Sequence, residues 1–157
     1  MEKTFSVVRM GRKHIDAVAQ LEQLCFSEPW SRQAIAAELE NPQAVVFVLE
    51  WEGNVAGYAG LRFVLDEASV SNVAVYPEYR HQGVGRALIQ AQKRFCLRRG
   101  FSLLTLEVRA SNATAIGLYR SEGFVVVGRR PGFYKMPAED AVLMTCFFGK
   151  RHAEQQT

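Results

Sequence analysis

Apolar and polar residues alternate in short runs along the chain, a pattern typical of β-strands. Glu52-Gly53-Asn54 separates two such runs and predicts a hairpin, and Asp66-Glu67 predicts a second turn. Pro77 ends the strand that follows this second turn. The predicted strands cover residues 5–9, 44–51, 55–64, 69–76, 102–110, 124–129 and 141–148.

Other segments place apolar residues three and four positions apart, which is the spacing of an amphipathic helix. The first predicted helix covers residues 14–26. Its expected buried face comprises Ile15, Val18, Leu21, Leu24 and Cys25. A second helix is predicted to begin after Ser31 and to end before Asn41-Pro42, because serine favours a helix start and proline disfavours continuation.

A third helix is predicted from the glycine-containing turn at residues 83–85 to Gly100. Its inward residues are expected to be Val84, Ala87, Leu88, Ala91 and Phe95. A fourth covers residues 112–122 and ends at Gly123, since glycine tolerates the backbone that closes a helix. Strands thus form a meander first and alternate with helices later, which predicts an α/β fold with a mixed sheet covered on both faces.

The composition indicates one soluble domain over residues 1–149, followed by a polar tail over residues 150–157. The chain has 157 residues, of which 48% are hydrophobic, enough for a sizeable core. Cys25, Cys96 and Cys146 are odd in number and far apart, which indicates reduced thiols in the cytoplasm. The histidines lack metal-ligand spacing, so no metal is expected. No signal peptide or membrane-spanning run is predicted.

The net charge of +3 is mild, and the basic residues are scattered, so nucleic acid is not an expected partner. The stretch "RHQGVGRALIQAQ", residues 80–92, is more informative, because it runs from a glycine-spaced turn directly into a helix. The first amides of a helix lack intrahelical partners, and the helix dipole adds positive charge there. The turn therefore favours an anion such as phosphate, although a plain strand-to-helix connection explains the glycines equally well.

Known phosphate-binding templates narrow this choice. A dinucleotide fingerprint requires a third glycine where Leu88 stands, and a P-loop requires a Gly-Lys-Ser/Thr sequence that the chain lacks. The pattern Arg-x-x-Gly-x-Gly after the strand "NVAVYP" instead resembles the GNAT superfamily of N-acetyltransferases. Within it, "PWS", "LDEASVSNVAV" and "LEVRASNATAIGLYRSEGF" are similar to the RimI group, whose members acetylate the N-terminal alanine of ribosomal small-subunit protein 18.

The resemblance implies a single-domain GNAT fold, with a mostly antiparallel sheet of about seven strands and a splay between the fourth and fifth. It also implies acetyl-CoA as cosubstrate, with the pantetheine arm bonded to backbone groups of one strand and the diphosphate held at the turn. A backbone N–H of that strand would also face the thioester oxygen. The implied cofactor-binding residues are Val73, Ala74, Val75, Arg80, His81, Gln82, Gly83, Val84, Gly85, Arg86 and Asn112.

Glu107 and Tyr119 are the candidate catalytic residues. Glu107 lies in the middle of a strand, where a carboxylate is costly to bury unless it is paired or reaches a cleft. From the residues alone, pairing with Arg109 is as good an explanation as catalysis. Tyr119 could likewise be an ordinary core aromatic. The resemblance implies that Glu107 is the general base and that Tyr119 protonates the leaving thiolate.

Asn112 is predicted to cap the fourth helix, which is compatible with its implied contact to the coenzyme. The resemblance places the acceptor peptide between "FSEPWS" and "RRPGFYKMPAED", with Trp30 and Tyr134 as candidate contacts. Packing between the first two helices is the favoured role for Trp30. Acidic residues near both segments could attract a basic peptide but are more often solvated loop residues: Glu28, Glu139 and Asp140.

The segment Pro131-Gly132-Phe133 departs from the group pattern, which leaves the acceptor open. Two classes of function are therefore retained. The first is an acetyltransferase for a protein N-terminal alanine, or alternatively for a lysine or a small amine. The second is a catalytically silent acyl-CoA-binding module on the same fold, since fold alone does not determine function.

Overall fold

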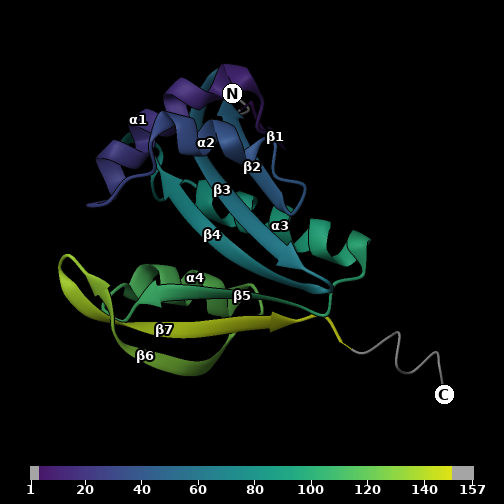
Figure 1. The fold of residues 1–157 in the computed structure, drawn as a ribbon, viewed down its shortest axis with the longest axis vertical. Helices are drawn as coiled ribbons and strands as arrows, with labels where there is room; N and C mark the ends of the chain where they lie inside the picture. The colour runs from purple at the N-terminus through teal and green to yellow at the C-terminus, as the bar shows by residue number, and fades with distance from the viewer. Residues whose placement is uncertain (1–3, 150–157) are drawn as a thin grey trace. The chain divides into compact units, whose positions relative to one another are not determined.

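The computed structural model describes residues 4–149, and its seven strands are hydrogen-bonded in the order β1-β2-β3-β4-β5-β7-β6 (Figure 1). The polar tail predicted at residues 150–157 lies outside the described residues. The chain divides into two compact units. The first comprises the described residues up to Arg62 together with Val70–Gln92, and the second comprises Phe63–Ser69 and the described residues from Lys93 onward.

The first unit is built on an antiparallel meander. Its strands are β1 (Phe5–Arg9), β2 (Ala44–Trp51), β3 (Asn54–Val64) and β4 (Glu67–Val75), the last two being shared with the second unit. Glu52 and Gly53 join β2 to β3 with φ of 50° and 84°, the left-handed conformations that a tight hairpin turn needs. The predicted hairpin is therefore confirmed.

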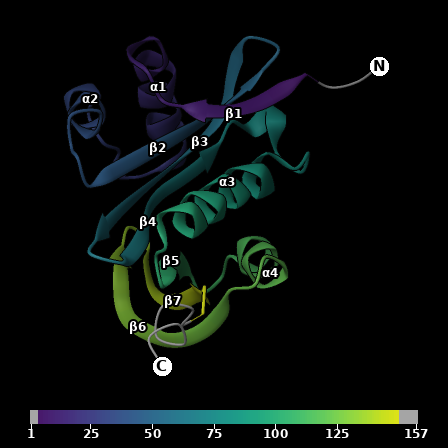
Figure 2. The same cartoon turned by 90° about the vertical axis from the view of Figure 1, so that its right-hand side faces the viewer.

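Helices cover both faces of this meander (Figure 2). On one face lie α1 (Ile15–Cys25), which follows the short helix η1 (Arg12–His14), and α2 (Arg32–Glu38). The predicted cap is confirmed, since the Ser31 side chain accepts a 3.0 Å hydrogen bond from Ala34 N. The first half of α3 (Val84–Arg99) lies on the other face, close enough to β3 that a Cβ at Gly57 would come within 3.1 Å of Val84 Cγ1 and 3.3 Å of Leu88 Cδ1.

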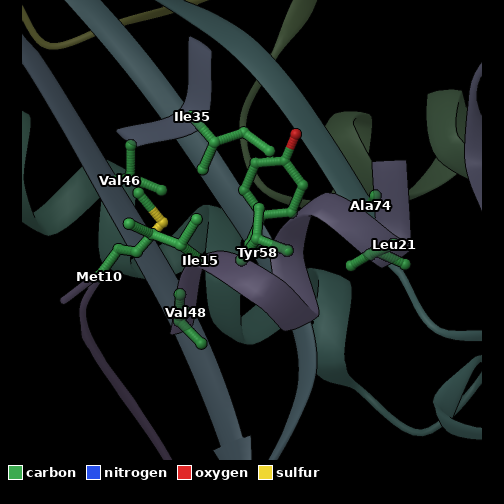
Figure 3. Close-up of a cluster of buried hydrophobic side chains, with 9 residues drawn as sticks. Met10, Ile15, Leu21, Ile35, Val46, Val48, Tyr58 and Ala74 are labelled. Atoms are coloured by element: carbon green, nitrogen blue, oxygen red, sulfur yellow. The ribbon is translucent and has the colours of Figure 1, made fainter. Parts of the chain in front are cut away.

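A hydrophobic cluster joins α1 and α2 to the sheet of this unit (Figure 3). It contains Met10, Ile15, Val18, Leu21, Ile35, Val46, Val48, Tyr58 and Ala74. Val18, Leu21 and Val48 are fully buried. Burial of this apolar surface is the main favourable contribution to folding of the unit.

The expected apolar face of α1 is wrong at one position. Leu24 is 58% exposed, whereas Glu22 is fully buried. The physical reason is helical spacing, because Glu22 lies seven residues after Ile15 and so returns to the same face after two turns. Three donors from three other segments satisfy its carboxylate: the Tyr58 hydroxyl, Asn72 Nδ2 at 2.9 Å and the Trp30 backbone N–H at 2.8 Å.

The second unit contains β5 (Leu103–Arg109), α4 (Ala113–Ser121), β6 (Val125–Lys135) and β7 (Ala138–Phe147). Strand β5 pairs in parallel with β4 over Glu67–Leu103, Ala68–Leu104 and Ser69–Thr105, and it pairs antiparallel with β7 along its whole length. Leu104, Leu106 and Val108 are buried, while Thr105, Glu107 and Arg109 are half-buried. The alternation predicted for this strand is confirmed.

The last two strands are longer than predicted. Strand β6 continues through Pro131 to Lys135, and β7 already begins at Ala138, where the sequence indicated a connecting segment. Proline is tolerated because β6 is the edge strand and its register with β7 shifts between Arg130 and Tyr134. Gly132, with φ of 64°, lies within this irregularity, and its N–H donates to Asp140 at 2.9 Å.

The buried carboxylate of Glu22 makes a stability prediction. Tyr58→Phe removes a donor from Glu22 and an acceptor from Asn72, whose Nδ2 lies 3.1 Å from the Tyr58 hydroxyl. We expect the free energy of unfolding in urea to fall by about 1–3 kcal/mol. Tyr79→Phe is the matched control, because that ring is half-buried against Trp51, and it should change stability by less than about 0.5 kcal/mol. Equal effects of the two variants would contradict the prediction.

Candidate active site

The glycine-containing turn lies in the first unit, between β4 and α3. The short helix η2 (Pro77–Tyr79) precedes it, and His81 and Gly83 adopt φ of 63° and 87°. Helix α3 starts at Val84, and Ala87 N donates to Gly83 O at 3.0 Å. The amides at this helix start lack intrahelical partners and carry the positive end of the dipole.

The side chains around this turn leave its backbone approachable. His81, Gln82, Gly83 and Arg86 are exposed, Gly85 is half-buried and Val84 is buried beneath them. A Cβ added at Gly83 would meet nothing within 4 Å, so the backbone conformation, rather than crowding, is what requires glycine there. Such a turn fits a phosphate group.

Arg80 folds back onto the end of β4. Its Nε donates to Val75 O at 3.1 Å, and its Nη2 lies 3.4 Å from the sulfur of Cys25. The guanidinium is therefore held beside the strand at the entrance to the turn. It places positive charge where the sequence pattern predicts the diphosphate.

Strand β4 directs alternate backbone groups away from β3. Tyr76 N donates to Ala56 O of β3 at 2.9 Å, so the carbonyl of Val75, in the same trans peptide, points the other way. By the alternation of a strand, the backbone groups of Val73 also point away from β3, and those of Ala74 point toward it. Val73 and Val75 are thus the residues of this strand that suit pairing with an added extended molecule, although the Val75 carbonyl already accepts the hydrogen bond from Arg80.

Trp30 has the structural role that was favoured for it. Its backbone N–H binds the carboxylate of Glu22, and its ring packs against the hydrophobic cluster and beneath the Arg62 guanidinium, whose Cζ lies 5.4 Å from the ring centre. These contacts connect the segment before α2 to α1 and β3. A contact between Trp30 and substrate stays a prediction.

Glu107 lies on β5 in the second unit, opposite Leu143 of β7. Its side chain is 29% exposed, and its carboxylate lies 3.7 Å from Nε of Arg130 on β6. Pairing with Arg109 is not what the structure shows. Arg109 instead donates to Pro137 O at 2.9 Å, to Met136 O at 3.1 Å and to Glu139 at 3.3 Å.

Tyr134 lies near both Arg109 and Glu107. The Arg109 guanidinium is centred 4.3 Å from its ring, and burial, followed by the nearby Glu107 carboxylate, raises the pKa of its hydroxyl. Tyr119 on α4 is buried, with its ring 5.6 Å from that of Phe124. Burial, with a smaller contribution from Tyr134, raises the pKa of Tyr119 to about 12.

The remaining predicted polar residues of this unit have structural partners. The Asn112 side chain caps α4 by accepting a 3.1 Å hydrogen bond from Ala115 N, as predicted. Glu139 accepts from Ser111 N, and this interaction holds the pKa of Glu139 below its ordinary value. The Gly132 N–H does the same for the pKa of Asp140. Glu139 therefore connects β7 to the end of β5 and the start of α4, and Asp140 connects β7 to β6.

The second unit thus gathers Glu107, Tyr119 and Tyr134 with two arginines, of which sequence reasoning missed Arg130. No periodic signal marked Arg130, because the shift in register follows it directly. The first unit gathers Arg80 and the turn with the end of β4. Among residues 4–149, no group of three or more potential ligands could hold a metal ion.

Comparisons with known proteins show which family the chain is similar to. The model of the GNAT acetyltransferase family matches residues 15–124, which include parts of both units. A Bacillus subtilis (strain 168) protein, provisionally named a ribosomal protein bS18-alanine N-acetyltransferase, is 40% identical over 144 residues, which cover 90% of this chain and 95% of that protein. The Escherichia coli (strain K12) protein with that name is 39% identical, over 83% of this chain and 88% of its own length.

Solved structures show the same likeness. The crystal structure of the Escherichia coli ribosomal-protein-S18-alanine N-acetyltransferase matches with a TM-score of 0.85 and 35% identity, covering 94% of this chain and 98% of that one. Ard1 from Thermoplasma volcanium matches with a TM-score of 0.83 and 25% identity, over 93% and 99% of the two chains. The expected fold class is therefore confirmed.

The chain belongs to the GNAT acetyltransferase family and, within it, to the group of ribosomal protein bS18-alanine N-acetyltransferases, called RimI. None of the helices described over residues 4–149 is long and apolar enough to cross a membrane.

The raised pKa of Tyr119 predicts how the protein responds to alkali. Because burial lifts the folded-state pKa above the ordinary value of about 10, the resulting stabilisation is complete below pH ~10 and is lost as the pH rises toward about 12. Titrating phenolate absorbance in the native protein and in Tyr119→Phe should give a difference curve with its midpoint near pH 12. A midpoint near the ordinary value would show that Tyr119 is accessible to water.

Proposed function

We propose that the chain transfers the acetyl group of acetyl-CoA to the N-terminal α-amine of ribosomal protein bS18, whose first residue is alanine, in the cytoplasm. The names of its relatives support this acceptor, since their sequences are 39–40% identical over most of both chains. The observation that carries a catalytic rather than a silent role is the convergence of Glu107, Tyr119 and Tyr134 in the second unit. A module that only binds an acyl-CoA needs neither a base nor an acid.

The first unit supplies the groups that would hold the cosubstrate. Acetyl-CoA brings an activated thioester, and its acetyl group moves to the amine nitrogen as the thiol is released. The backbone of residues 82–86 would bind the diphosphate at the start of α3, with Arg80 adding charge. Val73 and Val75 would pair with the pantetheine arm through the backbone groups that point away from β3.

The second unit supplies the proton transfers. An α-amine is largely protonated near neutral pH, so it must lose a proton before its nitrogen can attack. Glu107 would take this proton, directly or through water, because its carboxylate is partly exposed and makes no close hydrogen bond among the described residues. Tyr119 would donate its hydroxyl proton to the thiolate as the carbon–sulfur bond breaks, and its high pKa keeps that proton in place until then.

The proposed proton transfers predict a specific loss of turnover. Glu107→Gln and Tyr119→Phe should each lower kcat by about 10²–10⁴-fold, because each removes one proton-transfer group without changing the size of the side chain greatly. Calorimetry should show acetyl-CoA binding to both variants within about threefold of the native protein, since their side chains are not assigned to the cofactor. Glu40→Gln, at an exposed ion pair with Arg12, is the matched control and should leave kcat unchanged. Full activity in both catalytic variants would refute their roles.

The proposed acceptor is tested by competition between amines. The native protein is incubated with acetyl-CoA and peptides beginning Ala-Arg, the same peptides with an acetylated N-terminus and an internal lysine, and polyamines. We expect product only from the free N-terminal peptides, identified by mass spectrometry of the modified nitrogen. Preference for the capped lysine peptides or for polyamines would establish one of the alternative acceptors instead.

A further inference from the structure

Arg130 lies beside Glu107 and Arg109 lies beside Tyr134, and the two guanidinium groups differ in how many hydrogen bonds hold them. Arg109 donates to two backbone carbonyls and to Glu139, and its side chain is 30% exposed. Arg130 is 57% exposed, and its contact with Glu107 is an ion pair of 3.7 Å, longer than a hydrogen bond. One guanidinium is therefore fixed in the structure, and the other is free to move.

The position of Arg130 follows from the edge of the sheet. In the β6–β7 ladder Arg130 lies opposite Ala141, which in turn lies opposite Arg109 of β5, so β7 separates the two arginines. The register shifts immediately after Arg130, at the segment Pro131-Gly132-Phe133. The Phe133 ring already lies 5.8 Å from the Arg130 guanidinium on the same strand, so this contact can retain the side chain when its ion pair with Glu107 is broken.

We propose that Arg130 is a displaceable counter-ion of Glu107, and that the α-ammonium group of the acceptor takes its place. This inference rests on the proposed function, in which Glu107 receives a proton from a cationic amine. A carboxylate that accepts such a proton must first meet the ammonium group, and the Arg130 guanidinium is the cation that pairs with this carboxylate in the structure. Arg130 thus satisfies the carboxylate while no acceptor is bound and moves toward Phe133 when one arrives.

The weakness of the ion pair makes this exchange feasible. An exposed, screened ion pair without a close hydrogen bond contributes a free energy that corresponds to about two- to fivefold in a binding constant. Displacement of Arg130 by an arriving ammonium group therefore costs little free energy. The same exchange at Arg109 would break three hydrogen bonds, which is why we assign the role to Arg130.

The test compares two neighbouring arginines. Arg130→Gln should lower the KM for an Ala-Arg peptide by about two- to fivefold at low ionic strength, because the competing cation is gone. We expect kcat to stay within about twofold of the native value. Arg129→Gln is the matched control: it removes the same charge from the same strand, but Arg129 pairs with Asp140 and not with Glu107. Its KM should stay unchanged.

The effect of added guanidinium on KM separates displacement of Arg130 from a purely structural role of that residue. In Arg130→Gln added guanidinium should compete with the peptide and raise KM back toward the native value, whereas in Arg129→Gln and in the native protein it should have a much smaller effect. The inference is overturned if the two variants show equal KM values, or if guanidinium acts alike in all three proteins. Retained turnover in Glu107→Gln, by contrast, would refute the role of Glu107 as base, and preference for another amine in the competition experiment would refute the proposed acceptor.

Discussion

Buried backbone N–H and C=O groups need hydrogen-bond partners. In strand β4 this requirement decides which backbone groups are left for a ligand. The strand pairs with β5 over Glu67, Ala68 and Ser69, and it then continues to Val75 as part of the first unit. Its Tyr76 amide still binds β3, which sets the direction of every backbone group before it. The outward groups of Val73 and the outward N–H of Val75 therefore lie at a strand edge suited to an extended ligand, while Arg80 already binds the Val75 carbonyl, and the helix start at Val84 follows within the same unit.

The carboxylates of Glu22 on α1 and Glu107 on β5 lie in very different surroundings. Glu22 is fully buried and receives hydrogen bonds from three segments, so its charge is used to fix Tyr58, Asn72 and the start of the segment before α2. Glu107 retains access to water and has one long ion pair, with Arg130. Glu22 could accept a proton from a substrate only if its hydrogen bonds to Tyr58, Asn72 and Trp30 were broken. Glu107 could accept one without such a loss.

Much of the fold follows from local rules, and the failures of prediction have identifiable causes. Ser31, Gly53 and Asn112 act as predicted because caps and tight turns depend on residues close in sequence. The burial of Glu22 was missed because the buried face was assigned from apolar residues and a cysteine alone, although the spacing of Glu22 from Ile15 places it on that face. Of the two explanations left open for Glu107, pairing with Arg109 is excluded by a partner that the sequence could not reveal, because Glu139 is thirty residues away. The register of β6 could not be predicted, since it depends on pairing with β7 around Pro131 and Gly132.

An acid and a base in one reaction need opposite surroundings, and those of the proposed base, Glu107, and of the proposed acid, Tyr119, differ in this way. A base must be reachable by the incoming amine, and the partial exposure of Glu107 and the loosely held Arg130 meet that condition. An acid must keep its proton until the leaving group needs it, and burial of Tyr119 does so by raising its pKa to about 12. Tyr134 lies near both, since the Glu107 carboxylate contributes to the raised pKa of Tyr134 and Tyr134 contributes to the raised pKa of Tyr119, in each case after burial. Arg109 is itself held by hydrogen bonds to Pro137 O and Met136 O, so the Tyr134 ring packs on a guanidinium that the connection between β6 and β7 keeps in place.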